Sequence, residues 1–351
     1  DLIKELVFVG LIALKDPLRK ETKEALAICQ RAGIKVVIVT GDHKLTAKTI
    51  AEELGFQIKE ENILEGTVLE KISEEELARI IEKILLFVRV APHHKLKIVR
   101  AFQANGEIVA MLGDGVNDAP ALKAADVGVV VGSGTEVAKE VGDLILLDNN
   151  FLTIVKAIEQ GRVAFENVRK VFAYLLADDF SEIFLFLLAM ILRLPLPLLP
   201  AQILWINVLE DGLPDIALTT EKETKGIMNE PPRPPQEGVL NKPLKKWLTT
   251  IFFISGLAAF AVFFFTWKFT GDLAKARTIT FSLIALDSLI FVFSCRSFKR
   301  RVFRRDIFSN LYLDIAVFIS LILLILGVYF PPFQKILSTQ PLSFKNWLAI
   351  L

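Results

Sequence analysis

Over the first 150 residues, short apolar runs alternate with amphipathic stretches. The apolar runs are continuous rather than alternating, which is typical of strands buried on both faces of a sheet. They predict strands over residues 5–14, 35–39, 86–90, 108–112 and 127–131. Apolar positions at helical spacing predict helices over residues 20–32, 45–54, 73–85 and 94–104. Strands that alternate with helices indicate an α/β domain with a parallel sheet, here over residues 1–150.

From residue 151 onward the pattern is helical and becomes apolar. One helix is predicted from about 152 to 192, and its charged first part, residues 151–170, predicts a stalk. From residue 171 the helix is apolar enough to span a bilayer. Further spans are predicted at about 201–219, 247–268, 276–295 and 311–330, and residues 341–351 begin like a sixth. We therefore expect an α-helical transmembrane bundle over residues 171–351 with five complete spans.

The composition agrees with a membrane protein. Hydrophobic residues make up 53% of the chain and the mean hydropathy is +0.48, which is too apolar for a wholly soluble protein. The net charge of +1 argues against a nucleic-acid partner, and the two cysteines argue against a disulfide framework. The basic loop at 296–306 is expected to be cytoplasmic by the positive-inside rule. An even number of crossings separates it from residues 1–150, so we expect a multi-pass protein whose soluble domain is cytoplasmic.

Two carboxylates follow the strand predicted at 108–112. Asp114 lies between Gly113 and Gly115, and Asp118 follows four residues later. The glycines let backbone or phosphate come close, and paired carboxylates suit a hard cation such as Mg²⁺ held against a phosphate. For Gly-Asp-Gly alone, an acidic turn that caps a helix is the alternative, but the full run to Lys123 is more specific.

Further polar residues are expected at the same edge of the sheet. Thr40 and Asp42 follow the strand at 35–39, and Lys95 begins the helix after a third strand. Ligands gather at the carboxyl ends of parallel strands. A hydroxyl, an ammonium group and a carboxylate-held Mg²⁺ would together neutralise a transferring phosphoryl group. Taken singly these residues could be a helix-capping turn and a solvated helix start, but together they indicate a phosphoryl-transfer site.

Acidic residues fall inside two predicted spans. These acids, and one amide that accompanies them, are Asp178, Asp179, Glu182, Asn207, Glu210 and Asp211. Each acid at mid-bilayer costs about 2.5–3.5 kcal/mol on insertion scales. Pro214 cannot donate a backbone hydrogen bond, so it frees carbonyls one turn earlier, near these acids. Such oxygens suit a hard cation or protons. The alternative is that the acids pair with basic residues of neighbouring helices.

The run Gly113-Asp-Gly-Val-Asn-Asp118 resembles the hinge motif of P-type ATPases, the cation pumps that pass through an aspartyl-phosphate, and is most similar to their type II branch. Thr40-Gly41-Asp42 matches the family's Thr-Gly-Asp motif, and Asp16-Pro-Leu-Arg19 matches Asp-Pro-Pro-Arg except at Leu18. The resemblance implies a haloacid-dehalogenase-like, Rossmann-like phosphorylation domain with Mg²⁺ as cofactor and ATP as substrate. It assigns to catalysis Thr40, Gly41, Asp42, Lys95 and Asn117, to the Mg²⁺ site Asp114 and Asp118, and to the nucleotide Arg89.

Two membrane segments are also similar to this family. Residues 174–182 and 205–214 look like the two ion-binding helices of type II pumps. The ion ligands that this resemblance implies are Asp179, Glu182, Asn207, Glu210 and Asp211. Calcium pumps differ by an amide at the position of Asp179 and a threonine at that of Glu210, and Asp178 is an additional acid here. The excess negative charge favours a divalent cation, with Ca²⁺ preferred.

The Asp-Lys-Thr-Gly-Thr run that carries the family's phosphorylated aspartate does not occur in this sequence. Without the acceptor carboxylate no covalent intermediate can form, so the chain alone is expected not to turn over ATP. We interpret the chain as the C-terminal portion of a pump, cut at both ends, whose partner is the missing N-terminal part of the same protein. The alternatives are a membrane-anchored phosphatase of the same fold and an inert fragment.

Overall fold

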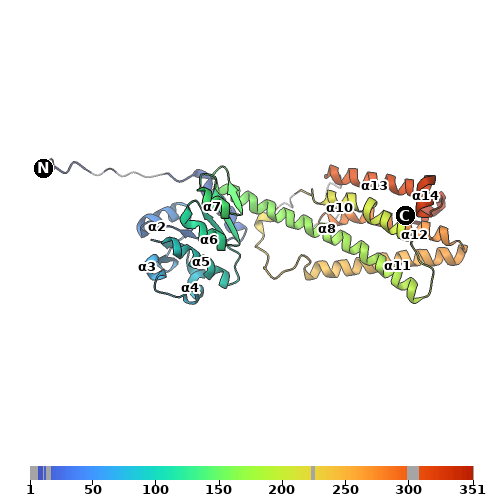
Figure 1. Ribbon diagram of the computed structural model, residues 1–351, viewed down its shortest axis with the longest axis horizontal. Helices are drawn as coiled ribbons and strands as arrows, with labels where there is room; N and C mark the ends of the chain where they lie inside the picture. Colours follow the sequence, from blue (N-terminus) through green and yellow to red (C-terminus); the bar gives the residue numbers. More distant parts are fainter. Residues whose placement is uncertain (1–6, 11, 13–16, 223–225, 299–307, 351) are drawn as a thin grey trace. The chain divides into compact units, whose positions relative to one another are not determined.

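A computed structural model describes residues 7–10, 12, 17–222, 226–298 and 308–350 (Figure 1). The chain folds into two compact units. The first unit comprises the residues up to Glu159 together with Met228–Pro235, and the second comprises Gln160–Ile227 with Gln236–Leu351. One helix, α8 (Phe151–Ile191), contributes residues to both.

The first unit is an α/β fold built from short elements (Figure 1). Its strands are β1 (Ile38–Val39), β2 (Ile63–Glu65), β3 (Leu86–Val88), β4 (Ala110–Gly113), β5 (Val127–Val131) and β6 (Leu144–Leu146). Its helices are α1 (Lys20–Arg31), α2 (Lys44–Glu53), α3 (Gly66–Leu69), α4 (Glu74–Ile80), α5 (Pro92–Ala104), α6 (Ala119–Ala124) and α7 (Glu136–Val141).

All strand pairs are parallel, as predicted, but they form two sheets rather than one. The strand orders are β1-β3-β2 and β4-β5-β6. The central strands β3 and β5 are largely buried, which explains their continuous apolar sequences. Among the described strands, β1 pairs only with β3 and β4 only with β5. On the β4 side, Ile108 and Leu112 are 65% and 40% exposed.

The strand predicted over residues 5–14 is not formed at its described positions. Residues 7–10 and 12 have no strand pairing, and the apolar side chains among them are 79–97% exposed. A strand is stable when neighbouring strands and a packed face support it, and none of the described strands pairs with this run. This prediction is therefore wrong for the described residues. Asp16 of the Asp-Pro-Leu-Arg motif lies outside them.

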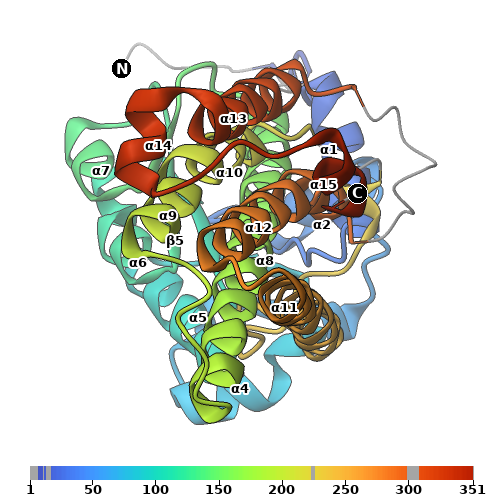
Figure 2. The ribbon, with the colours of Figure 1, turned by 90° about the vertical axis from the view of Figure 1, so that its right-hand side faces the viewer.

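The second unit is entirely helical within the described part of the chain. In addition to its share of α8, its helices are α9 (Pro200–Trp205), α10 (Gly212–Leu218), α11 (Lys242–Thr270), α12 (Leu273–Cys295), α13 (Leu311–Tyr329), α14 (Pro331–Leu337) and α15 (Phe344–Ile350). Figure 2 shows α12 between α11 and α13, and it packs against both. This central place agrees with its many buried side chains.

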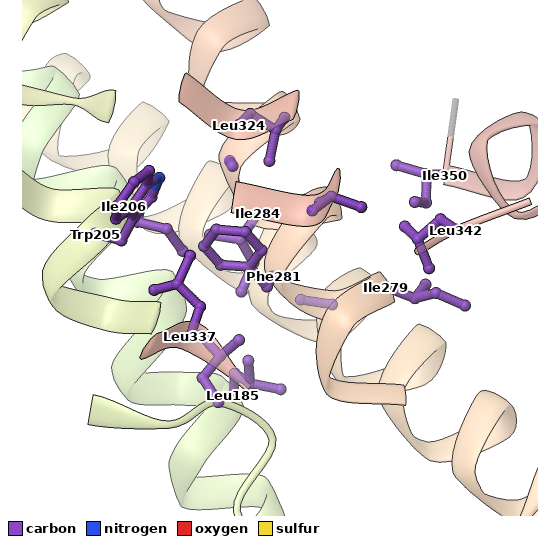
Figure 3. Packing of buried hydrophobic residues seen from close by; sticks show 14 residues of the cluster. Leu185, Trp205, Ile206, Ile279, Phe281, Ile284, Leu324, Leu337, Leu342 and Ile350 are labelled. Atoms are coloured by element: carbon purple, nitrogen blue, oxygen red, sulfur yellow. The ribbon is translucent and has the colours of Figure 1, made fainter. Parts of the chain in front are cut away.

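A hydrophobic cluster joins most of these helices (Figure 3). Trp205 and Ile206 lie at the end of α9 and face Phe281 of α12. Leu324 of α13 and Leu337 of α14 belong to the same cluster. Phe281 is 0% exposed, and close packing of this kind, rather than removal from water, stabilises contacts between helices in a membrane. The cluster therefore fixes the end of α9, from which the predicted ion ligands follow.

Three helices in the described part of the chain are long and apolar enough to cross a bilayer, namely α11, α12 and α13. The two other expected spans, the second half of α8 and residues 201–219, are not long and apolar enough by the same criterion. The apolar half of α8 contains three acids within five residues, and the segment at 201–219 is broken into the short helices α9 and α10. Five spans thus remain a prediction. The basic loop expected at 296–306 lies mostly outside the described residues.

Candidate functional site

The lysine and the two carboxylates predicted for the phosphoryl site lie together in the first unit. Lys95 Nζ donates to Asp118 Oδ1 at 2.5 Å, and the backbone N–H of Asp114 donates to Asp118 Oδ2 at 3.3 Å. Asp118 is 4% exposed, so Lys95 rather than water balances its charge. Asp114 follows β4 and is exposed. Asp118 therefore holds the lysine and the turn, while the Asp114 carboxylate faces outward.

Gly113 makes this turn possible. A Cβ at residue 113 would lie 2.7 Å from the Cβ of Asp118, closer than real side chains approach. The chain continues through the single turn Val116–Asp118 into α6, whose first turn contains Pro120. Asn117 lies in that single turn and is exposed. Gly113 thus lets the turn close until Asp118 accepts the backbone N–H of Asp114, and a common position for the two carboxylates stays a prediction.

Thr40, Gly41 and Asp42 form a tight turn after β1. The N–H of Asp42 donates to Thr40 Oγ1 at 3.1 Å. The carbonyls of Asp42 and Thr40 accept from the N–H groups of Arg89 and Val90, both at 3.1 Å. Arg89 has a φ of +51°, a left-handed conformation that is uncommon outside glycine. Backbone hydrogen bonds therefore hold the Thr40–Asp42 turn against Arg89, the predicted nucleotide-contacting residue, just after β3.

These residues offer the groups that phosphoryl transfer requires. The exposed Asp114 carboxylate is an oxygen donor of the kind that fits Mg²⁺, whereas both carboxylate oxygens of Asp118 already accept hydrogen bonds, from Lys95 and from the Asp114 N–H. Lys95 adds a positive charge beside Asp118, and the Thr40 hydroxyl accepts one N–H while keeping its own proton to donate. The described residues thus carry a carboxylate suited to Mg²⁺, an ammonium group and a hydroxyl donor. Their individual roles stay predictions.

In the second unit, one hydroxyl bridges two aspartates. Ser288 Oγ of α12 lies 2.9 Å from Asp178 Oδ2 and 2.5 Å from Asp211 Oδ1. Tyr174 Oη donates to Asp211 Oδ1 at 2.9 Å and lies 2.5 Å from Ser288 Oγ. Tyr174, Asp211 and Ser288 are all at most 2% exposed. Polar contacts therefore join α8, the chain before α10, and α12 inside an apolar bundle.

Two glutamates near these residues are buried without full hydrogen bonding. Glu210 is 0% exposed, and neither carboxylate oxygen has a hydrogen-bond partner among the described residues. Glu182 is 6% exposed, its Oε1 likewise lacks a described partner, and Asn207 lies close enough to interact with its carboxyl group. A buried ion pair between Arg296 and Glu221, at 2.7 Å, involves neither glutamate.

The alternative that the intramembrane acids pair with basic residues is not seen among the described residues. No lysine or arginine there forms an ion pair with Asp178, Glu182, Glu210 or Asp211. Burying carboxylates without counter-ions is costly, so such residues in membrane segments mark ion or proton sites. The arrangement therefore favours an ion-binding role.

The backbone beside these acids departs from the α-helix. Ile206–Glu210 forms a π-helical turn, in which the N–H of Asp211 donates to the carbonyl of Ile206 at 2.9 Å. Pro214 has no N–H for the carbonyl of Glu210, which instead accepts from Ser320 Oγ of α13 at 2.8 Å. The freed carbonyl expected from Pro214 is thus present, and α13 occupies it. Single π-helical turns frequently occur at functional sites.

The structure distinguishes two neighbouring acids, of which only Asp179 was predicted to be an ion ligand. Asp179, the predicted ligand, is exposed, whereas Asp178 contacts Ser288. Sequence reasoning noted Asp178 as an additional acid but gave it no role, and it missed Ser288. No sequence feature pointed to Ser288, because its partners Asp178 and Asp211 lie 110 and 77 residues away along the chain. A role for Asp179 stays a prediction.

Comparisons with known proteins match both units. The family described as cation transporting ATPase, C-terminus, matches residues 195–351. Two families described as haloacid dehalogenase-like hydrolase match residues 2–126 and 95–158. The predicted fold of the first unit and the transport character of the second are therefore each supported by a separate family.

Curated relatives align with nearly the whole chain. A calcium-transporting ATPase of Bacillus subtilis is 46% identical over 99% of this chain and 39% of its own length. Calcium-transporting ATPase 1 of Saccharomyces cerevisiae is 36% identical, covering 100% of this chain and 37% of the relative. Calcium-transporting ATPase type 2C member 1 of Homo sapiens is 36% identical, over 99% of this chain and 38% of the length of the relative.

The chain thus spans about two fifths of the length of the curated relatives it matches. These relatives, together with the three apolar helices, identify an integral membrane protein. The two family matches and the curated relatives agree with one another. The chain belongs to the type II P-type cation-transporting ATPases, of which it forms a C-terminal portion.

Proposed function

We propose that this chain is the C-terminal part of an ATP-driven pump that forms an aspartyl-phosphate and moves Ca²⁺ across a membrane. The observation that carries the proposal is a group of four acids, the buried Glu182, Glu210 and Asp211 and the half-buried Asp178, which have no basic partner among the described residues. Oxygen ligands in such number suit a hard divalent cation. Its relatives in Bacillus subtilis and Homo sapiens are named as calcium transporters.

The phosphate-handling roles follow from where the side chains lie. Asp114 would hold Mg²⁺, which when bound neutralises charge on the phosphate oxygens. Asp118 keeps Lys95 in place, and the lysine ammonium would contact the transferring phosphoryl group. The Thr40 hydroxyl would donate to a phosphoryl oxygen, and Arg89 would contact ATP. We assign the soluble unit to the cytoplasm, where ATP is available.

The phosphorylated aspartate would come from the upstream part of the pump. The outer edges of β1 and β4 have no partner strand among the described residues. Thr40–Asp42 follows one of these strands and Asp114 follows the other. A parallel strand added at such an edge would end beside these residues, because functional groups gather at the carboxyl ends of parallel strands. We infer that the strand bearing the acceptor aspartate binds there.

In the membrane, Glu182, Asn207, Glu210 and Asp211 would ligate Ca²⁺. Asp179 would complete the site from its exposed side, toward parts of the pump outside this chain. A membrane-anchored phosphatase would leave these acids without a role, so the pump is the stronger proposal. An inert fragment would show no ion dependence in any context.

The test is Ca²⁺-dependent phosphorylation by ATP, measured in membranes that contain the intact pump. Glu182→Gln and Asp211→Asn each remove one charge with little change in shape, and we expect each to abolish ATP phosphorylation at Ca²⁺ concentrations that saturate the parent protein. Phosphorylation by inorganic phosphate without Ca²⁺ should persist, because the first unit is unchanged.

The matched control is Asp272→Asn, at the exposed start of α12, where asparagine can still accept the N–H of Lys275. This control should behave as the parent protein does. Unchanged Ca²⁺ dependence in both test variants would contradict the ion site. An intact pump that forms no phosphoenzyme at all would contradict the whole proposal.

A further inference from the structure

A carboxylate and two imidazoles outside the predicted catalytic set connect α3 to the start of α5. Glu70 directly follows α3, and His93 and His94 lie in the first turn of α5. His93 Nε2 and His94 Nε2 lie 2.9 Å and 2.6 Å from the same oxygen, Glu70 Oε2. His94 is 5% exposed. Lys95 is the next residue.

The hydrogen bonds of His94 define what this cluster can do. Its Nδ1 accepts the backbone N–H of Ala91 at 3.1 Å, so in the neutral ring the proton lies on Nε2. That proton is then donated to Glu70, and Nε2 has no free lone pair for a metal ion. The three side chains have the proximity of a metal site, but this tautomer favours a hydrogen-bonded clamp. Hydrogen bonds from His93 and His94 also hold the pKa of Glu70 below its usual range, which keeps the clamp charged.

Residues 66–72 also contact the chain on both sides of the connection between β3 and α5, which contains Arg89. Lys97 Nζ donates to the carbonyls of Leu69, at 2.7 Å, and Ile72. At the start of α3, a Cβ on Gly66 would lie 2.0 Å from the carbonyl oxygen of Arg89, so only glycine fits. The segment therefore contacts the chain on both sides of the junction that carries Arg89 and Lys95.

We propose that Glu70 and His94 are positioning residues for Lys95. Glu70 holds the first turn of α5 through His94, and this fixes the direction from which Lys95 reaches Asp118 and the phosphoryl group. The inference rests on the proposed phosphoryl-transfer function. A displacement of about 1 Å at a reacting group can lower a rate by roughly a hundredfold, so a clamp of modest stability can have a large effect on rate.

The contact of His94 with Glu70 can be removed while its contact with Ala91 is kept. In His94→Asn the side-chain oxygen can still accept the Ala91 N–H, but the contact with Glu70 is lost. In His94→Gln the amide nitrogen can still donate to Glu70, and the amide oxygen can accept the Ala91 N–H, as Gln202 accepts the N–H of Leu199 at the same position of α9. The experiment measures the rate of phosphoenzyme formation from ATP and the ATP concentration at half-maximal rate, both in the intact pump.

We expect Glu70→Ala and His94→Asn to lower the phosphorylation rate roughly tenfold with little change in ATP dependence, and His94→Gln to retain most of the rate. The matched control is Glu74→Ala, which removes a second carboxylate paired to α5, 3.7 Å from Arg100 but farther along the helix from Lys95. It should leave the rate unchanged.

Lys95→Ala separates this inference from the proposed function. If Lys95→Ala slows phosphorylation while Glu70→Ala and His94→Asn do not, the positioning role is wrong and the phosphoryl site stands. If Lys95→Ala has no effect, the proposed site itself is wrong. A parent enzyme whose rate falls when Zn²⁺ is removed by a chelator at saturating Mg²⁺, with that response lost in His94→Asn, would identify a metal site and overturn the clamp.

Discussion

Ser288 shows how one side chain can organise two buried charges. Its hydroxyl carries a single proton, yet it lies within hydrogen-bond distance of Asp178, Asp211 and Tyr174. A hydrogen bond to a charged group contributes about 1.5–3 kcal/mol. In Ser288→Ala the two carboxylates lose the group that orients them, so we expect the Ca²⁺ concentration for half-maximal phosphorylation to rise at least about tenfold.

The same helix provides the control for this prediction. Ser282 of α12 is also 0% exposed, but its hydroxyl has no hydrogen-bond partner among the described residues. Ser282→Ala removes the same atom without removing a contact and should leave the Ca²⁺ dependence unchanged. Equal behaviour of the two variants would show that the hydroxyl bridge plays no part in ion binding.

The sequence predicted the kinds of residues in the site better than their individual positions. Asp114, Asp118 and Lys95 were predicted together, because short spacing and strand ends place them within one region. The sequence named Asp179 and not Asp178 as an ion ligand. Adjacent residues on a helix point about 100° apart, and the position of α12 decides that Asp178 is the one that contacts Ser288. Glu70 was missed because exposed glutamates are common and its partners are 23 and 24 residues away.

At the scale of elements, α8 and α11 approach closely at a glycine. A Cβ on Gly256 would lie 2.8 Å from the carbonyl oxygen of Ser181, next to Glu182. Gly161, within α8, has no other atom within 4 Å of such a Cβ. Both glycines lie inside long helices, but Gly256 is in close contact with a neighbouring helix and Gly161 has open space around it.

This contrast predicts opposite outcomes for the same substitution. Gly161→Ala should raise the free energy of unfolding by about 0.5–1 kcal/mol, because alanine favours the helix. Gly256→Ala should lower it by about 1–3 kcal/mol, because the helices must separate, and it should also weaken Ca²⁺ binding at Glu182. Thermal unfolding in detergent measures both changes. A neutral Gly256→Ala would show that α8 and α11 do not pack closely in the protein.

Element types were largely predictable because hydrophobic periodicity reflects which faces are buried. The prediction of β5 matches residue for residue, and the one long helix predicted at 152–192 is α8. The π-helical turn was not predictable in detail. Pro214 predicted that a backbone carbonyl one turn earlier lacks its helical hydrogen bond. The partner of that Glu210 carbonyl, Ser320, lies on a helix 110 residues away and could not be predicted.

At the scale of the whole molecule, the division of the parallel strands into two sheets is the main departure from the sequence prediction. Alternating strands and helices indicate a parallel sheet but not the order of its strands, which depends on long-range pairing. The apolar run at 5–14 was predicted as a strand from its continuous apolar pattern. At its described positions it has no strand partner, so the pattern was insufficient.

Hydrogen exchange tests whether the edges of β1 and β4 receive a strand in the intact pump. In the chain alone, the outward amides of β4 should exchange much faster than those of β5, which is paired on both sides. In the intact pump both strands should be protected. Fast exchange of β4 in the intact pump would contradict the inserted acceptor strand.

The same unpaired edges have a practical consequence for the isolated polypeptide. Each edge presents a row of backbone donors and acceptors, and on β4 these lie beside the exposed side chains of Ile108 and Leu112. Two copies can satisfy these groups by aligning edge to edge, so production of this chain without the rest of the pump favours dimers and aggregates. Co-expression of the rest of the pump should restore a monodisperse product.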